Sequence, residues 1–132
     1  MTENIMNDVV INTLADSNDM FAKMRFLNAY NNAYSLKDYM NTTLYVCDVF
    51  VTNGIRRGYG GAEDTPCYNV YLIATDGACY FTQSSGVARS VFMINETLPD
   101  WGKSGSDGCV KVRCVEKVTT GGNRMKSLEI MY

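Results

Sequence analysis

The hydrophobic pattern of the chain changes its period once, near Thr43, and this change constrains the fold more than any other feature. Before it, Met20, Met24 and Leu27 recur at the i, i+4, i+7 spacing of an amphipathic helix. After it, the run TLYVCDVFVT is rich in β-branched and aromatic residues, which is typical of a strand. We therefore expect a helical extension followed by a β-rich body.

Five strands and one helix are predicted in this body, in the order β-β-β-α-β-β. Turn-forming segments separate the strands: the glycine-rich loop NGIRRGYGGAED, the pair Asp76-Gly77 and the turn TTGGN. The helix has one apolar face, which includes Val87 and Val91, and it stops before Pro99. The predicted strands cover residues 43–52, 67–75, 78–83, 109–118 and 124–132, and the helix covers residues 86–98.

This order is that of an OB-type barrel, a partly open Greek-key barrel of five strands. We expect a mainly β protein in one domain over residues 1–132, with a helical N-terminal extension over 1–42 and the barrel over 43–132. An open five-stranded sheet with packed helices is the competing architecture. The barrel is favoured because the first strand is long enough to bend and serve both halves.

Composition argues against most enzyme classes. The chain has no histidine, so it lacks the imidazole base of Ser-His-Asp and Cys-His sites. The phosphate-binding G-x-x-x-x-G-K-[ST] and G-x-G-x-x-G motifs are missing, and the carboxylates are scattered, with Glu63 and Asp64 adjacent in a loop. We expect no enzyme and no cofactor.

The five cysteines are odd in number and include no C-x-x-C pair. Structural zinc sites need close ligand pairs, and the chain has neither such a pair nor a histidine to complete a set, so buried free thiols are the favoured interpretation over a metal site. They are Cys47, Cys67, Cys79, Cys109 and Cys114. The N-terminal MTENIMND has no basic segment, and no apolar run approaches the ~20 residues of a membrane span. We expect a soluble protein of the cytoplasm, without a membrane partner.

Basic residues concentrate near the C-terminus. The net charge is −2, yet residues 101–132 hold six basic and three acidic side chains. In the predicted fourth strand, alternation places Lys111, Arg113 and Lys117 on the face opposite the apolar residues, and the last strand adds Arg124 and Lys126. A solvated face and a phosphate-binding face both fit this pattern.

Aromatic residues supply the second candidate feature. Tyr59 lies in RRGYGG, beside Arg56 and Arg57, in a loop with no strand to bury it, whereas Tyr80 and Phe81 have opposite parity, so one should face outward. Exposed rings stack on bases at ~1–3 kcal/mol per base, although core packing is the alternative role for each ring. The candidate DNA-binding residues are Arg56, Arg57, Tyr59, Tyr80, Phe81, Lys111, Arg113, Arg124 and Lys126.

Several short segments, taken in order, carry a resemblance to a known family. They are Phe26-Leu27-Asn28-Ala29, Ser35-Leu36-Lys37, Tyr59-Gly60, Ala74-Thr75-Asp76-Gly77-Ala78-Cys79-Tyr80, the helix 87–98, and Ser127-Leu128-Glu129-Ile130. The chain resembles the single-stranded-DNA-binding proteins of small tailed phages that replicate by protein priming.

The resemblance implies an OB-fold protein that coats and protects displaced strands during phage DNA replication, without sequence preference, in the cytoplasm of the infected host. It implies that Tyr59 and Tyr80 stack on bases. Phage replication proteins and further copies of the chain are the additional partners considered. The extra Arg56-Arg57 pair and the lack of an acidic tail depart from related patterns, so recruitment of partners is the less secure expectation.

A structural protein is the alternative function. A phage head accessory subunit or assembly adaptor on a similar small β-domain would explain the acidic balance of the chain. It would also explain the apolar N-terminal helix, which could pack on another subunit.

Overall fold

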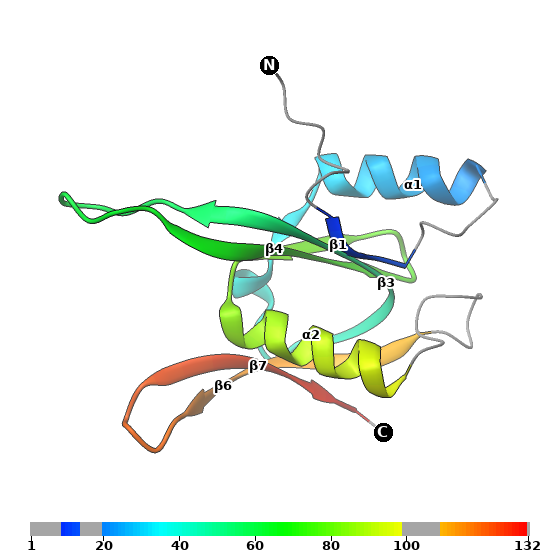
Figure 1. Cartoon of the computed structure of the whole chain (residues 1–132). Helices are drawn as coiled ribbons and strands as arrows, with labels where there is room; N and C mark the ends of the chain where they lie inside the picture. The colour runs from blue at the N-terminus through cyan, green and yellow to red at the C-terminus, as the bar shows by residue number, and fades with distance from the viewer. Residues whose placement is uncertain (1–8, 14–19, 99–108, 132) are drawn as a thin grey trace.

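One long strand, β3 (Thr43–Arg56), organises the sheet in the computed structural model of the chain, which describes residues 9–13, 20–98 and 109–131 (Figure 1). Along one edge, β3 pairs with β4 (Thr65–Ala74). Along the other edge it pairs first with β6 (Val110–Val118) and then with β1 (Val9–Asn12). Because one strand serves two partners in succession, it bends and curls the sheet.

The bend coincides with a β-bulge at Cys47, where the register against β4 shifts between Val46 and Asp48. Before the bulge, Leu44 and Val46 face the core, whereas Val49 and Val51 do so after it. The extra residue therefore moves the inward set from even to odd positions, as expected when a bulge interrupts strict alternation. Without it, Asp48 would take an inward position.

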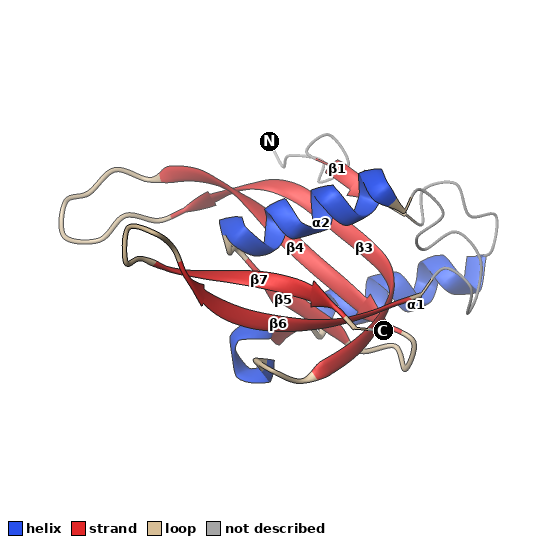
Figure 2. Cartoon of the chain, turned by 90° about the horizontal axis from the view of Figure 1, so that it is seen from below, coloured by secondary structure: helices blue, strands red, loops and turns tan. Residues whose placement is uncertain are grey.

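The complete sheet follows the order β2-β5-β4-β3-β6-β7, with β1 attached to β3. The remaining strands are β2 (Tyr34–Ser35), β5 (Cys79–Thr82) and β7 (Arg124–Ile130). Pairing is antiparallel except between β2 and β5. The mainly β prediction is confirmed, as a curled mixed sheet in the form of a half-barrel (Figure 2).

Two strands were not predicted, because β1 has only four residues and β2 only two. Both precede Thr43, so the described part of the N-terminal region joins the sheet and is not purely helical. It also contains the helix α1 (Met20–Asn31) and a 3-10 turn, η2 (Leu36–Tyr39). None of the helices within the described ranges is long and apolar enough to span a bilayer.

The helix α2 (Ser85–Thr97) lies beside β7 and contacts β4, so it fills the open side of the half-barrel (Figure 2). Its buried residues include the predicted Val87 and Val91. The capping residue is Ser84, and its Oγ accepts a hydrogen bond from the Val87 amide at 3.3 Å.

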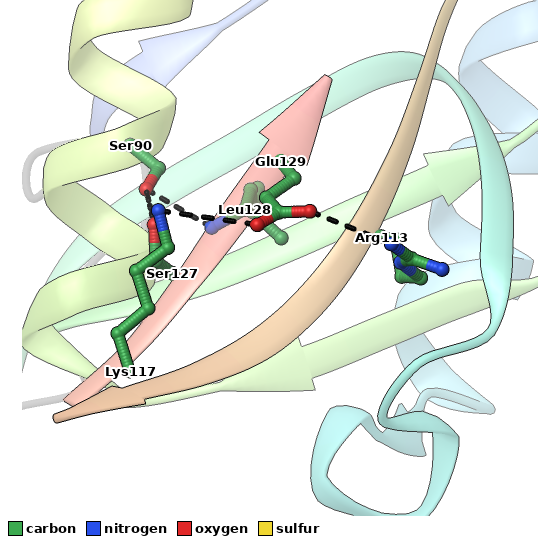
Figure 3. A network of polar contacts seen from close by, with 6 residues as sticks. All are labelled: Ser90, Arg113, Lys117, Ser127, Leu128 and Glu129. Atoms are coloured by element: carbon green, nitrogen blue, oxygen red, sulfur yellow. Dashed lines mark hydrogen bonds and ion pairs between the residues drawn. The ribbon is translucent and has the colours of Figure 1, made fainter. Parts of the chain in front are cut away.

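Small residues let α2 lie directly against the backbone of β7. A Cβ at Gly86 would overlap the carbonyl oxygen of Lys126. One turn later, Ser90 Oγ accepts a hydrogen bond from the amide of Leu128 at 3.1 Å and shares another with Ser127 Oγ at 3.3 Å (Figure 3). The helix thus takes the place that a further strand would take at this edge.

Stacking of Tyr80 on bases, which the resemblance implies, requires an outward ring, but the structure places this ring inward. The Tyr80 side chain is 8% exposed and lies in the main core, opposite the buried Leu72, and its ring contacts those of Tyr34 and Tyr39. Phe81 has the opposite orientation and is half-buried. Alternation separates the faces of two neighbouring residues but does not say which face is inside.

The expectation of five free thiols is also wrong, because Cys47 and Cys109 form a disulfide across 62 residues of sequence. Their neighbours Val46 and Val110 are paired between β3 and β6, so the bond lies where these strands begin to separate. Cys79 and Cys114 are buried free thiols, as predicted, and Cys67 is half-buried.

Thiol counting tests this arrangement. We expect three reactive thiols per chain in denaturant without reductant and five after reduction. Five thiols before reduction would contradict the pairing. In the folded protein at pH ~8, Cys79 should stay unreactive, since burial raises the pKa of its thiol to about 12 and so keeps it protonated.

The disulfide should also stabilise the fold. Because it closes a 62-residue separation, the chain-entropy account gives a contribution of about 4 kcal/mol, which is measured as the loss of unfolding free energy in Cys47→Ser.

Truncation of Tyr80 tests its position in the core. Tyr80→Ala should lower the unfolding free energy by about 3–5 kcal/mol, because a large buried ring is removed. Phe81→Ala is the control on the same strand and should cost less, because that ring is only half-buried. Chemical denaturation measures both, and equal losses would contradict the assignment of faces.

Candidate nucleic-acid interface

The hairpin of β6 and β7 carries five basic side chains and two acidic ones over residues 110–130. Strand register divides them between two faces. Lys111, Arg113 and Lys117 lie on the outer face, away from the core residues Val112 and Cys114. The hairpin is thus a basic element, but only part of its charge lies on one surface.

The structure does not place Arg124 and Lys126 with the outer lysines and Arg113. Lys126 pairs with Glu116, and Arg124 pairs with Val118, so both follow the inner parity of Cys114. The thiol of Cys114 has a pKa raised by burial and partly lowered again by the nearby Lys126 charge, which is consistent with this placement. Proximity in the sequence predicts that Arg124 and Lys126 lie with Lys111 and Arg113, but the strand register places the two pairs on different faces.

An exposed ring joins the outer cations. Tyr45 on β3 pairs with Lys111 on β6, and the Lys111 Nζ lies 5.6 Å from the centroid of the Tyr45 ring. The Tyr45 side chain is 52% exposed. We call the surface formed by Tyr45, Lys111, Arg113 and Lys117 the outer basic face. Tyr45 was not among the predicted site residues, although its alternation with Leu44 and Val46 could have identified it.

Several cations of the hairpin form ion pairs with carboxylates. Arg113 Nη2 lies 3.5 Å from Glu129 Oε2, and Lys117 Nζ lies 4.0 Å from Glu129 Oε1 (Figure 3). On the other face, Arg124 Nη1 lies 3.8 Å from Glu116 Oε2. All of these side chains are partly exposed, so each pair contributes only about 0–1 kcal/mol and can exchange its partner.

The β3–β4 hairpin forms an arm that projects beyond the rest of the sheet (Figure 1). Residues 53–56, predicted as loop, are strand here, because Asn53 to Arg56 pair with Tyr68 to Thr65. Cross-strand pairing overrides the low strand propensity of Gly54. The loop itself therefore covers only residues 57–64.

The three predicted residues of the arm, Arg56, Arg57 and Tyr59, have different environments. Arg56 Nη2 donates a hydrogen bond to the Gln83 carbonyl at 2.6 Å, so this side chain ties the last residue of β3 in the arm to the residue after β5. Arg57 is exposed, and Tyr59 is 88% exposed, which agrees with its prediction as a loop ring. Of the three predicted residues, Arg57 and Tyr59 are therefore the exposed ones that this bond to Gln83 does not hold.

Phe81 belongs to an aromatic cluster on the outer face of the sheet. Its ring centroid lies 5.0 Å from that of Tyr71, which contacts Phe50 and Tyr30. Burial, followed by a hydrogen bond with Tyr30, raises the pKa of the Tyr71 hydroxyl. The helix α1 packs Ala29 near this region, so Phe81 is only partly available to a ligand.

The arm and the turn between β6 and β7 project from the same end of the molecule (Figures 1 and 2). Tyr45 and Lys111 lie nearer the start of β6, away from that turn. The structure thus brings Tyr45, Lys111 and Arg113 together and leaves Tyr59 on a separate element. The outer basic face offers charge for an anion and a ring for stacking.

No group of three or more His, Cys, Asp or Glu side chains suited to a metal ion occurs in residues 9–13, 20–98 and 109–131. Comparison of the chain with protein-family models, with curated proteins and with solved structures finds no match.

Proposed function

We propose that the chain is a single-stranded-DNA-binding protein that coats and protects displaced strands without sequence preference. The observation that carries the proposal is the outer basic face, where the exposed Tyr45 ring lies beneath Lys111, with Arg113 two residues further along β6, opposite Thr43. Rings stack on any base, and cations neutralise phosphates without reading base edges. This chemistry suits a flexible single strand.

The order of the elements supports an OB-type fold. The strand sequence β5-β4-β3-β6-β7, with α2 inserted between β5 and β6 along the chain, is consistent with an OB-type barrel that is left open, because β5 pairs with β2 and β7 contacts α2. OB folds bind oligonucleotides with the loops that join their first two and last two strands. The corresponding loops here, residues 57–64 and 119–123, project from one end (Figure 2). In this interpretation α1 is an addition to the barrel.

The resemblance to phage single-stranded-DNA-binding proteins supplies the biological setting. In the proposal the chain acts during phage DNA replication in the host cytoplasm, alongside the phage replication proteins. It works as a binding protein and requires neither a catalytic residue nor a cofactor.

A second candidate function, a phage structural or assembly protein, is favoured by one specific observation. Three apolar side chains on α1, Met20, Met24 and Leu27, are 72%, 56% and 59% exposed. Their helical spacing makes a continuous stripe, and exposed apolar patches often mark protein interfaces. The two functions therefore place their binding surfaces on different elements.

The first prediction is selective binding of single strands through Tyr45. Titration with oligo-dT should quench tyrosine emission, and duplex of equal length should bind at least about tenfold more weakly. Tyr45→Ala should weaken oligo-dT binding by about 1–3 kcal/mol, whereas Tyr45→Phe keeps the ring and should bind normally. Tyr34→Ala is the control, since Tyr34 is also 52% exposed but lies on β2, which β5 and β4 separate from β3 in the sheet order. Equal affinity for duplex and single strand would reject the proposal.

The second prediction separates the two functions. If the chain binds DNA through the outer basic face, the double variant Met24→Glu and Leu27→Glu should keep its oligo-dT affinity within about twofold. Sedimentation velocity of the wild type and the variant measures association through α1. An assembly protein would instead show self-association that the variant abolishes, together with no oligo-dT binding by either protein.

A further inference from the structure

Glu129 lies between two cations on the outer basic face. Its Oε2 is 3.5 Å from Arg113 Nη2, and its Oε1 is 4.0 Å from Lys117 Nζ. One carboxylate thus presents one oxygen to each cation, as Figure 3 shows. A phosphodiester also carries two non-bridging oxygens and a single negative charge, so it could likewise present one oxygen to each of these two side chains.

We propose that Arg113 and Lys117 form a phosphate subsite for the DNA backbone and that Glu129 occupies this subsite when DNA is absent. This inference rests on the proposed single-strand binding and names a part of its site. Lys117 joins the predicted residues as a phosphate ligand. Glu129 acts as an internal competitor that weakens binding and reduces its dependence on salt.

Arg113 has an unused donor that favours this exchange. Its Nε is buried and has no hydrogen-bond partner among the described residues, while its Nη2 contacts Glu129. Arginine binds phosphates most strongly when two of its N–H groups act together. A phosphate that replaces Glu129 and contacts both nitrogens would satisfy the donor that the carboxylate leaves unpaired.

The backbone that carries Glu129 is fixed, so the exchange involves the side chain alone. Ser90 of α2 accepts a hydrogen bond from the amide of Leu128, the residue before Glu129, and its hydroxyl also bonds Ser127 (Figure 3). The Glu129 side chain is 39% exposed, and those of Arg113 and Lys117 are 37% and 56% exposed. Solvent can therefore receive the carboxylate when a phosphate arrives.

The chain offers a matched control in Glu116. This carboxylate pairs with Arg124 at 3.8 Å on the same hairpin but on its other face. Glu129→Gln and Glu116→Gln change the net charge equally, and each removes a carboxylate from exposed ion pairs: Glu129 from Arg113 and Lys117, and Glu116 from Arg124. Any difference between them therefore reports the position of the carboxylate and not the charge of the protein.

The experiment is a fluorescence titration of oligo-dT against the wild type and both variants at several salt concentrations, with melting temperatures as the folding check. Glu129→Gln should tighten binding about three- to tenfold at low salt, because it frees two cations. It should also steepen the slope of log K against log salt by about 0.7, as for one more phosphate neutralised. Adding Arg113→Gln to Glu129→Gln should remove the gain.

Equal effects of Glu129→Gln and Glu116→Gln would overturn the subsite, since only net charge would then matter. Weaker binding by Glu129→Gln would overturn it too, because Glu129 would then be part of the binding surface. If the folded wild type does not bind oligo-dT, the proposed function fails, and a second measurement decides the subsite. Pyrophosphate should then shift the Arg113 Nε–Hε resonance in Glu129→Gln and not in Glu116→Gln; no selective shift would reject the subsite.

Discussion

The bulge at Cys47 is the constraint on which the rest of the fold depends. Strand β3 must present apolar residues to one core while it changes partners from β6 to β1. A single extra residue achieves this by moving the inward positions from Val46 to Val49 and by increasing the local twist. The disulfide to Cys109 holds β6 at the same point, so curvature, partner exchange and covalent linkage coincide within a few residues.

Local periodicity predicted much of this architecture. The apolar face of α2 and the order of the main strands follow from spacings within single segments, so Val87 and Val91 were identified correctly. Properties that depend on contacts between segments distant in the sequence were not predicted correctly. The inward orientation of Tyr80 and the disulfide between Cys47 and Cys109 arise from long-range contacts, and no local pattern encodes them.

The same limit explains the candidate site. Lys111 and Arg113 were predicted because they share one strand, but Tyr45 joins them only through the pairing of β3 with β6. Arg56 was predicted as a DNA-binding residue, whereas in the structure its side chain donates a hydrogen bond to the Gln83 carbonyl and supports the arm. Local sequence indicates which side chains can bind an anion, whereas the strand register decides which of them reach the same ligand.

The close packing of α2 against β7 affects how copies of the chain behave when crowded. An open strand edge is a template on which another chain can add a strand, and high local concentration promotes such growth. Here the Ser90 hydroxyl accepts a hydrogen bond from the Leu128 amide, and Gly86 lets the helix backbone lie against the carbonyl of Lys126. We therefore expect the helix to block the addition of another strand at this edge, and two small residues, Ser90 and Gly86, allow the close packing on which this block depends.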